Sequence, residues 1–165
     1  MADTIAIIAC GNINRRDDGA GPEVLRLLRS QDLGGTAANI RLLDAGTDGM
    51  AVMFAAKGCT TLIIVDACRS GSEAGAIFEV PGGELEQPQR DSYTLHDFRW
   101  DHALFAGRKL FRDAFPREVT VFLIEAEQLD FGIGLSDKVA AAARDVAGRI
   151  QTMLRVRAAP QGEAP

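Results

Sequence analysis

Residues 4–24 of the chain are TIAIIACGNINRRDDGAGPEV. The first seven, Thr4–Cys10, form the continuous apolar, β-branched run that is typical of a buried parallel strand. The run breaks at a Gly-Asn pair, and the acidic pair Asp17-Asp18 follows. Pro22 then indicates the first turn of a helix, where its missing N–H would be unpaired in any case. The stretch therefore predicts a strand, a turn and a helix start, with two carboxylates at the C-terminal end of a core strand.

Strand-like and helix-like segments alternate along the rest of the chain. Further strands are predicted at Ile40–Asp44, Thr61–Val65, Ala76–Val80 and Val119–Glu125, and helices at Pro22–Arg29, Met50–Ala56, Thr94–Arg112 and from Ser136 onward. Because the segment before residue 76 is shorter than the dozen or so residues of a parallel crossover, the strand at 76–80 is expected to be antiparallel and at an edge. The predicted fold is an α/β three-layer sandwich, with a twisted, mostly parallel five-stranded sheet, one antiparallel edge strand and helices on both faces.

The size and composition of the chain fit one domain. With 165 residues, 47% of them hydrophobic, the chain can bury one core. We expect a single domain over residues 1–157 and a disordered tail over residues 158–165, which is poor in structure-forming residues. A net charge of −5 disfavours binding to nucleic acid and to anionic membranes.

The cysteines and the apolar runs bear on where the protein works. Three cysteines, an odd number, lie in or beside apolar runs and resemble reduced thiols rather than a disulfide framework. The apolar runs are far shorter than the ~20 residues of a membrane-spanning helix, and acidic Asp3 precedes the first one, unlike in a signal peptide. These features predict a cytoplasmic protein.

Two of the predicted strands end in acidic residues. The acidic pair Asp17-Asp18 follows the first strand closely, and Asp66 ends the strand at 61–65. Each could have only a local role, at a helix N-terminus for the pair and as a turn cap for Asp66. If the strands are neighbours at a point where strand order reverses, both carboxylates meet in the crevice where α/β sheets bind ligands. Two unpaired carboxylates repel, so a cation is the expected third group.

His96 is the candidate third ligand. Thr94 and Asp97 resemble a capping box, which would place His96 just inside a helix start, where the helix dipole favours the neutral imidazole that binds metals. A lone histidine can equally be a surface residue. His102 lies about 120° away around such a helix and is assigned a structural role. Two Asp and one His suit Zn, Ni, Fe or Mn.

No complete metal, phosphate or dinucleotide motif is present. The chain has no HExxH or CxxC pair, and CGNINR lacks the later glycines of GxGxxG. Three scattered ligands without a closed cage indicate a metal shared with a partner. A second possibility is a nucleophilic Cys68 with His96 as its base, although no elbow-like turn follows that strand.

Five blocks carry a resemblance to a known family. They are ACGNINRRDDGAGPEV (residues 9–24), LDAGTDGM (43–50), LIIVDAC (62–68), SYTLHDF (92–98) and GLS (134–136). In order and spacing, over about residues 5–150, the chain resembles the hydrogenase maturation proteases. These endopeptidases trim the C-terminal extension of the large subunit of nickel-iron hydrogenases, and their fold is a twisted, mostly parallel sheet between helices.

The resemblance implies a role for each candidate ligand. The family's metal-contacting residues correspond to Asp18, Asp66 and His96 here, and they would recognise nickel already inserted in the precursor rather than a tightly held metal of their own. Gly46 and Thr47, beside the same sheet edge, are expected to line the groove for the substrate peptide. We expect a monomer whose partner is the nickel-loaded large-subunit precursor.

The chain departs from the family pattern at two positions. Ala9 stands where a glycine is usual, and Asp18 is one methylene shorter than the glutamate that many members carry. His102, in the block HDFRWDH, is a competing histidine. A non-catalytic nickel-binding or hydrogenase-assembly chaperone of the same fold is the alternative function.

Overall fold

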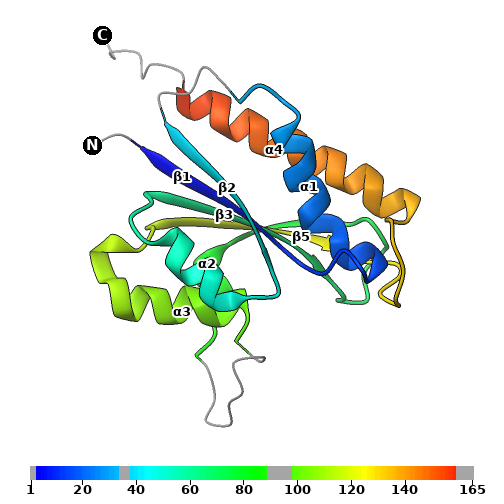
Figure 1. Ribbon diagram of the computed structural model, residues 1–165, viewed down its shortest axis with the longest axis horizontal. Helices are drawn as coiled ribbons and strands as arrows, with labels where there is room; N and C mark the ends of the chain where they lie inside the picture. The colour runs from blue at the N-terminus through cyan, green and yellow to red at the C-terminus, as the bar shows by residue number, and fades with distance from the viewer. Residues whose placement is uncertain (1–2, 34–37, 89–97, 159–165) are drawn as a thin grey trace.

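A five-stranded sheet forms the centre of the protein in a computed structural model that describes residues 3–33, 38–88 and 98–158 (Figure 1). The strand order is β2-β1-β3-β5-β4. The first four strands in this order are parallel, and β4 pairs antiparallel with β5 at the edge. The bounds are β1 Thr4–Cys10, β2 Asn39–Gly46, β3 Thr61–Cys68, β4 Ile77–Pro81 and β5 Glu118–Glu125.

Helices cover both faces of this sheet (Figure 1). One face carries α1 (Ala20–Arg29) and α4 (Asp137–Ala158), and the other carries α2 (Gly49–Ala56) and α3 (Trp100–Phe111). Short 3-10 turns lie at Arg16–Gly19 (η1), Gly82–Glu84 (η2) and Arg112–Ala114 (η4). Among the described residues no helix is both long and apolar enough to cross a membrane.

The central strands are buried on both sides because their side chains alternate between two cores. Ile5 and Ile7 of β1 pack beneath α1 and α4, whereas Ala6 and Ile8 pack beneath α2 and α3. Ile63 and Ile64 of β3 divide between the two cores in the same way. This is why each strand has an unbroken apolar run, Ile5–Cys10 in β1 and Leu62–Val65 in β3, rather than an alternating pattern. The predicted α/β sandwich with one antiparallel edge strand is confirmed.

The helix predicted from Thr94 begins later than expected. Its first residue is Trp100, and the N-cap is Arg99, whose backbone is extended (φ −95°, ψ 175°). The Arg99 N–H donates to Nδ1 of His102 at 3.2 Å, so His102 helps to satisfy the helix start. The prediction that Thr94 caps this helix is therefore wrong, and Thr94 itself lies outside the described residues.

Gly49 explains why the chain stays extended before α3. A Cβ at Gly49 would lie 2.3 Å from the carbonyl oxygen of Phe98 and 2.7 Å from that of Arg99. The backbone of this segment therefore packs directly on the start of α2, an approach that only glycine permits. The amphipathic pattern of residues 94–112 does not predict this contact, because the contact is made with a distant part of the chain. Of the predicted tail, only Ala158 is described, as the last residue of α4.

Candidate active site

The two predicted carboxylates share a pocket at the C-terminal ends of β1 and β3. The chain passes from β1 to β2 on one side and then returns to β3 on the other, so the strand order reverses between β1 and β3. Ligands bind at such reversals in open α/β sheets. The pocket has a volume of about 290 Å³, and its walls include Asp18, Gly46, Thr47, Asp66, Arg99 and Trp100.

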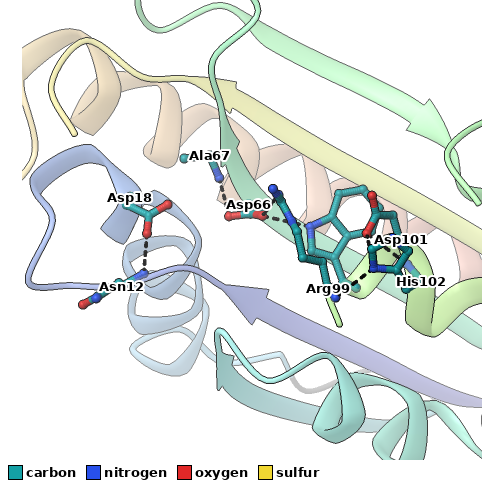
Figure 2. A network of polar contacts seen from close by, with 8 residues as sticks. Asn12, Asp18, Asp66, Ala67, Arg99, Asp101 and His102 are labelled. Atoms are coloured by element: carbon teal, nitrogen blue, oxygen red, sulfur yellow. Dashed lines mark hydrogen bonds and ion pairs between the residues drawn. The ribbon is translucent and has the colours of Figure 1, made fainter. Parts of the chain in front are cut away.

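Asp66 is held firmly inside this pocket (Figure 2). It is only 6% exposed and lies within β3 rather than after it, because β3 continues to Cys68 alongside β5. The Ala67 N–H donates to Oδ1 and the Trp100 indole N–H donates to Oδ2, each at 2.8 Å. The Arg99 guanidinium lies 3.9 Å from Oδ2. The orientation of the carboxylate is thereby fixed before any ligand arrives.

The pKa of Asp66 is raised to about 6, chiefly by burial and in smaller part by the charge of Asp18, while the Trp100 hydrogen bond opposes the shift. Since the folded-state pKa lies above the ordinary 3.8, the folded protein binds this proton more tightly than the unfolded chain does. Ionisation of Asp66 therefore costs stability as the pH rises through this range.

We expect this cost to appear in the difference between wild type and Asp66→Asn. Relative to the variant, the wild-type free energy of unfolding should fall by about 3 kcal/mol from about pH 4 to above about pH 6. Urea unfolding of both proteins across this range measures the difference, in which most contributions from other carboxylates cancel. A difference that does not change with pH would contradict the raised pKa.

Asp18 reaches the same pocket from the 3-10 turn η1 (Figure 2). Its Oδ2 accepts a hydrogen bond from the Asn12 N–H at 2.9 Å. Gly11 makes this turn possible, because its φ is +128° and a Cβ there would lie 2.0 Å from the Asp18 carbonyl oxygen. The turn thus folds back onto the end of β1 and directs Asp18 toward Asp66.

The neighbouring Asp17 has a different role. It is fully buried, and its carboxylate accepts hydrogen bonds from the backbone N–H groups of Glu127, Gln128 and Ser136 at 2.7–2.9 Å. The Ser136 hydroxyl adds a fourth at 3.0 Å. Asp17 therefore ties the loop between β5 and α4 to the turn after β1. The acidic pair divides into one residue that anchors loops and one that lines the pocket.

The predicted third ligand, His96, lies outside the described residues. The prediction that His96 lies just inside the start of this helix is wrong, because α3 begins four positions later, at Trp100. His102 has the structural role predicted for it. Within residues 3–33, 38–88 and 98–158, no group of three His, Cys, Asp or Glu side chains is placed to hold a metal ion.

Arg99 and Trp100 are pocket residues that the sequence analysis missed. Trp100 is the chain's single tryptophan. It comes two residues after the SYTLHDF block, directly after Arg99. A buried indole N–H requires an acceptor, and in this pocket the acceptor is Asp66. The need of a buried tryptophan for an acceptor is therefore the one feature of the sequence that points to a contact between Trp100 and a polar group. Nothing local indicates that Arg99 lies beside a carboxylate.

Cys68 is poorly suited to act as a nucleophile. Its Sγ donates to the buried Glu125 carboxylate at 3.2 Å. The thiol pKa is raised to about 12, chiefly by burial and then by the hydrogen bond to Glu125. The Glu125 pKa is lowered to about 2, chiefly by the hydrogen bond from Ser70. The thiol is therefore protonated at neutral pH and bonded to a permanent anion.

A family model described as hydrogenase maturation protease matches residues 24–153. The chain belongs to the hydrogenase maturation protease family. The resemblance seen in the five sequence blocks is thus confirmed. The match covers most of the chain, including Asp66 and the segment that contains His96.

Individual relatives agree with this assignment. A Methanocaldococcus jannaschii protein assigned to the same proteases is 28% identical over 145 residues, covering 84% of this chain and 88% of its own length. The hydrogenase expression/formation protein HoxM of Azotobacter vinelandii is 28% identical over 142 residues, covering 85% of this chain and 67% of its own length.

Solved structures of the family share the fold. The hydrogenase maturating endopeptidase HybD from E. coli superposes with a TM-score of 0.73 at 23% identity, covering 94% of this chain and 93% of that one. HybD from Thermococcus kodakarensis gives 0.69 at 22% identity, with 93% and 99% covered. At these identities the likeness supports the architecture, while the roles of Asp18, Asp66 and His96 remain predictions.

Proposed function

We propose that this member of the family is an endopeptidase that removes the C-terminal extension of a nickel-iron hydrogenase large-subunit precursor after nickel insertion. The main support is the meeting of Asp18 and Asp66 in one pocket at the strand-order reversal. In this proposal Asp18, Asp66 and His96 contact the nickel that the precursor carries. Recognition of that nickel would make cleavage depend on completed metal loading.

The electrostatics of the pocket support a cationic substrate group. A buried carboxylate is costly when ionised, and the charge of Asp18 increases that cost for Asp66. Arg99 compensates only partly, since its guanidinium lies 3.9 Å from Oδ2 and its side chain is 65% exposed. A divalent cation brought by the substrate would relieve the repulsion. Carboxylate and imidazole ligands suit nickel.

Metal-assisted hydrolysis needs no protein nucleophile. The metal either polarises the scissile carbonyl or activates a water molecule, and the same three residues would position it for both routes. This agrees with the protonated, hydrogen-bonded state of Cys68.

The end of β2 offers a place for the substrate backbone. Gly46 has a φ of +55°, and a Cβ built on it would meet no atom within 4 Å. Together with Thr47 it forms an open part of the pocket wall. We assign these two residues to the groove that binds the peptide around the scissile bond.

The proposed function predicts a strict dependence on nickel in the precursor. Purified enzyme should shorten nickel-loaded precursor and leave nickel-free precursor intact, with the product mass measured by mass spectrometry. Equal cleavage of both forms would contradict nickel recognition. Binding of the loaded precursor without any loss of mass would instead identify a non-catalytic nickel-binding or assembly chaperone.

Cysteine chemistry is tested separately. Because the Cys68 thiol has a pKa of about 12 and Cys68 is not among the residues that line the pocket, we expect Cys68→Ala to retain cleavage within about threefold of wild type. Treatment with iodoacetamide should also leave the rate unchanged. Loss of activity in both experiments would favour a cysteine-dependent hydrolase.

A further inference from the structure

Apolar side chains gather on two loops beside the pocket. The described residues include six exposed large hydrophobic side chains, and three of them lie in the loops after β1 and β5. Ile13 is 58% exposed, Phe131 79% and Ile133 75%. The other three are dispersed over α2, α3 and α4. Exposed apolar residues that cluster often mark an interaction site, whereas isolated ones need no explanation.

These two loops are held in one conformation by hydrogen bonds. The Arg16 N–H donates to the Gly132 carbonyl, and the Gly132 N–H donates to the Asn14 carbonyl, each at 2.9 Å. The buried Asp17 adds the bonds to the loop after β5 described above. Because the loops are already ordered, a partner would bind them without paying for their ordering.

A groove runs between the loops, on the other side of the turn η1 from the active-site pocket. It has a volume of about 250 Å³, and its walls include Ile13, Gly19, Pro22, Arg16, Ile133 and Leu135. Asp18 lines the pocket and the next residue, Gly19, lines the groove. The groove is therefore within reach of the body of a protein whose tail enters the pocket.

Arg15, on the loop beside the groove, gives the surface a charge, whereas Glu23 and Arg26 in the groove wall pair with each other. Arg15 donates from Nε to the Leu129 carbonyl at 3.1 Å, and its guanidinium lies 5.3 Å from the centre of the Phe131 ring. Within the described part of the chain, no carboxylate forms an ion pair with it. Arg16 pairs with Asp130 nearby. An apolar surface that carries an uncompensated cation, on a chain of net charge −5, fits apolar side chains accompanied by a carboxylate.

We propose that Ile13, Arg15, Phe131 and Ile133 form a docking surface for the folded body of the large-subunit precursor, whose C-terminal extension enters the adjacent pocket. The inference rests on the proposed function for the identity of the partner. A second copy of the chain fits less well, because a symmetric contact would place two surfaces of the same charge against each other.

The test compares two double variants of exposed residues. Ile13→Ser/Ile133→Ser alters the docking surface, and Leu110→Ser/Val156→Ser alters side chains that are 67% and 69% exposed on α3 and α4. We expect the first variant to raise the Kd for nickel-loaded precursor roughly tenfold or more, as measured by calorimetry, and the control to stay within about twofold. Arg15→Glu should also raise this Kd, and the increase should be larger at low salt than at high salt.

The possible results separate this inference from the proposed function. A Kd unchanged by Ile13→Ser/Ile133→Ser, or no binding of precursor by wild type, would overturn the docking surface. Binding that depends on these residues, without shortening of the precursor, would retain the surface and reject the protease assignment. Sedimentation of the enzyme alone gives a further check. A wild-type dimer that this variant dissociates, with precursor affinity unchanged, would assign the surface to self-association and overturn the proposal.

Discussion

Asp66→Asn is expected to lower kcat/KM for cleavage of nickel-loaded precursor by roughly 10²–10³-fold. The substitution keeps the size of the side chain but removes its charge from a buried position (6% exposed). Charge stabilisation by a metal contributes several kcal/mol in such reactions, and each 1.36 kcal/mol corresponds to a factor of about ten in rate. The Ala67 and Trp100 N–H groups donate to different oxygens of Asp66, and asparagine replaces one of these oxygens with an NH2 group, so one of the two donors would lose its acceptor.

Asp48→Asn is the matched control. The substitution removes the same charge from another residue in the wall of the same pocket. Its Oδ1, however, accepts from the Ala51 N–H at 3.1 Å and caps α2, a role that asparagine performs equally well. We expect its kcat/KM to remain within about threefold of wild type. Asp18→Asn and His96→Gln should follow Asp66→Asn, and wild-type rates for all three would show that the site assignment is wrong.

The sequence predicts those parts of the site that depend on local pattern. β1 and β3 each contain an unbroken apolar run that is buried on both faces, so the positions of these strands and of the acids near the ends of the runs follow from neighbouring residues alone. The partner of β4 does not follow in this way. β4 comes directly after β3 in the chain, yet it pairs with β5, which is inserted between the two.

Side chains whose roles depend on distant segments could not be predicted. Trp100 reaches Asp66 only because the start of α3 packs on the start of α2 through Gly49. The helical period of residues 94–112 contains no such information, and the predicted helix was accordingly too long at its N-terminus.

The two adjacent aspartates show the same limit. Asp17 and Asp18 are chemically identical and follow the same strand, so no local pattern distinguishes them. Their difference comes from the loop after β5, whose N–H groups lie 110 to 119 residues further along the chain. The assignment of Asp18 to the pocket came from the family resemblance, and the structure supplies the reason why Asp17 is not available for that role.

Asp17→Ala is expected to destabilise the protein by about 3–5 kcal/mol. The change would leave the buried N–H groups of Glu127, Gln128 and Ser136 without their acceptor, and each unpaired buried group costs about 1–3 kcal/mol. Domains of this kind are stable by only about 5–15 kcal/mol in total. A decrease in Tm of roughly 10 °C or more should follow, measurable by calorimetry or by circular dichroism.

Asp18→Ala provides the comparison for this prediction, since it removes the same group one residue away. Asp18 accepts one hydrogen bond, from Asn12, at the pocket wall, so its loss should cost only about 1 kcal/mol while cleavage is strongly reduced. Asp17→Asn, which keeps one acceptor oxygen, should lie between wild type and Asp17→Ala in stability. If the Asp17→Ala variant had the same Tm as wild type but no longer cleaved the precursor, Asp17 would have a role in the reaction rather than in anchoring the two loops. Because the same loops carry Ile13 and Ile133, loss of the Asp17 anchor should also weaken precursor binding at temperatures where the variant remains folded.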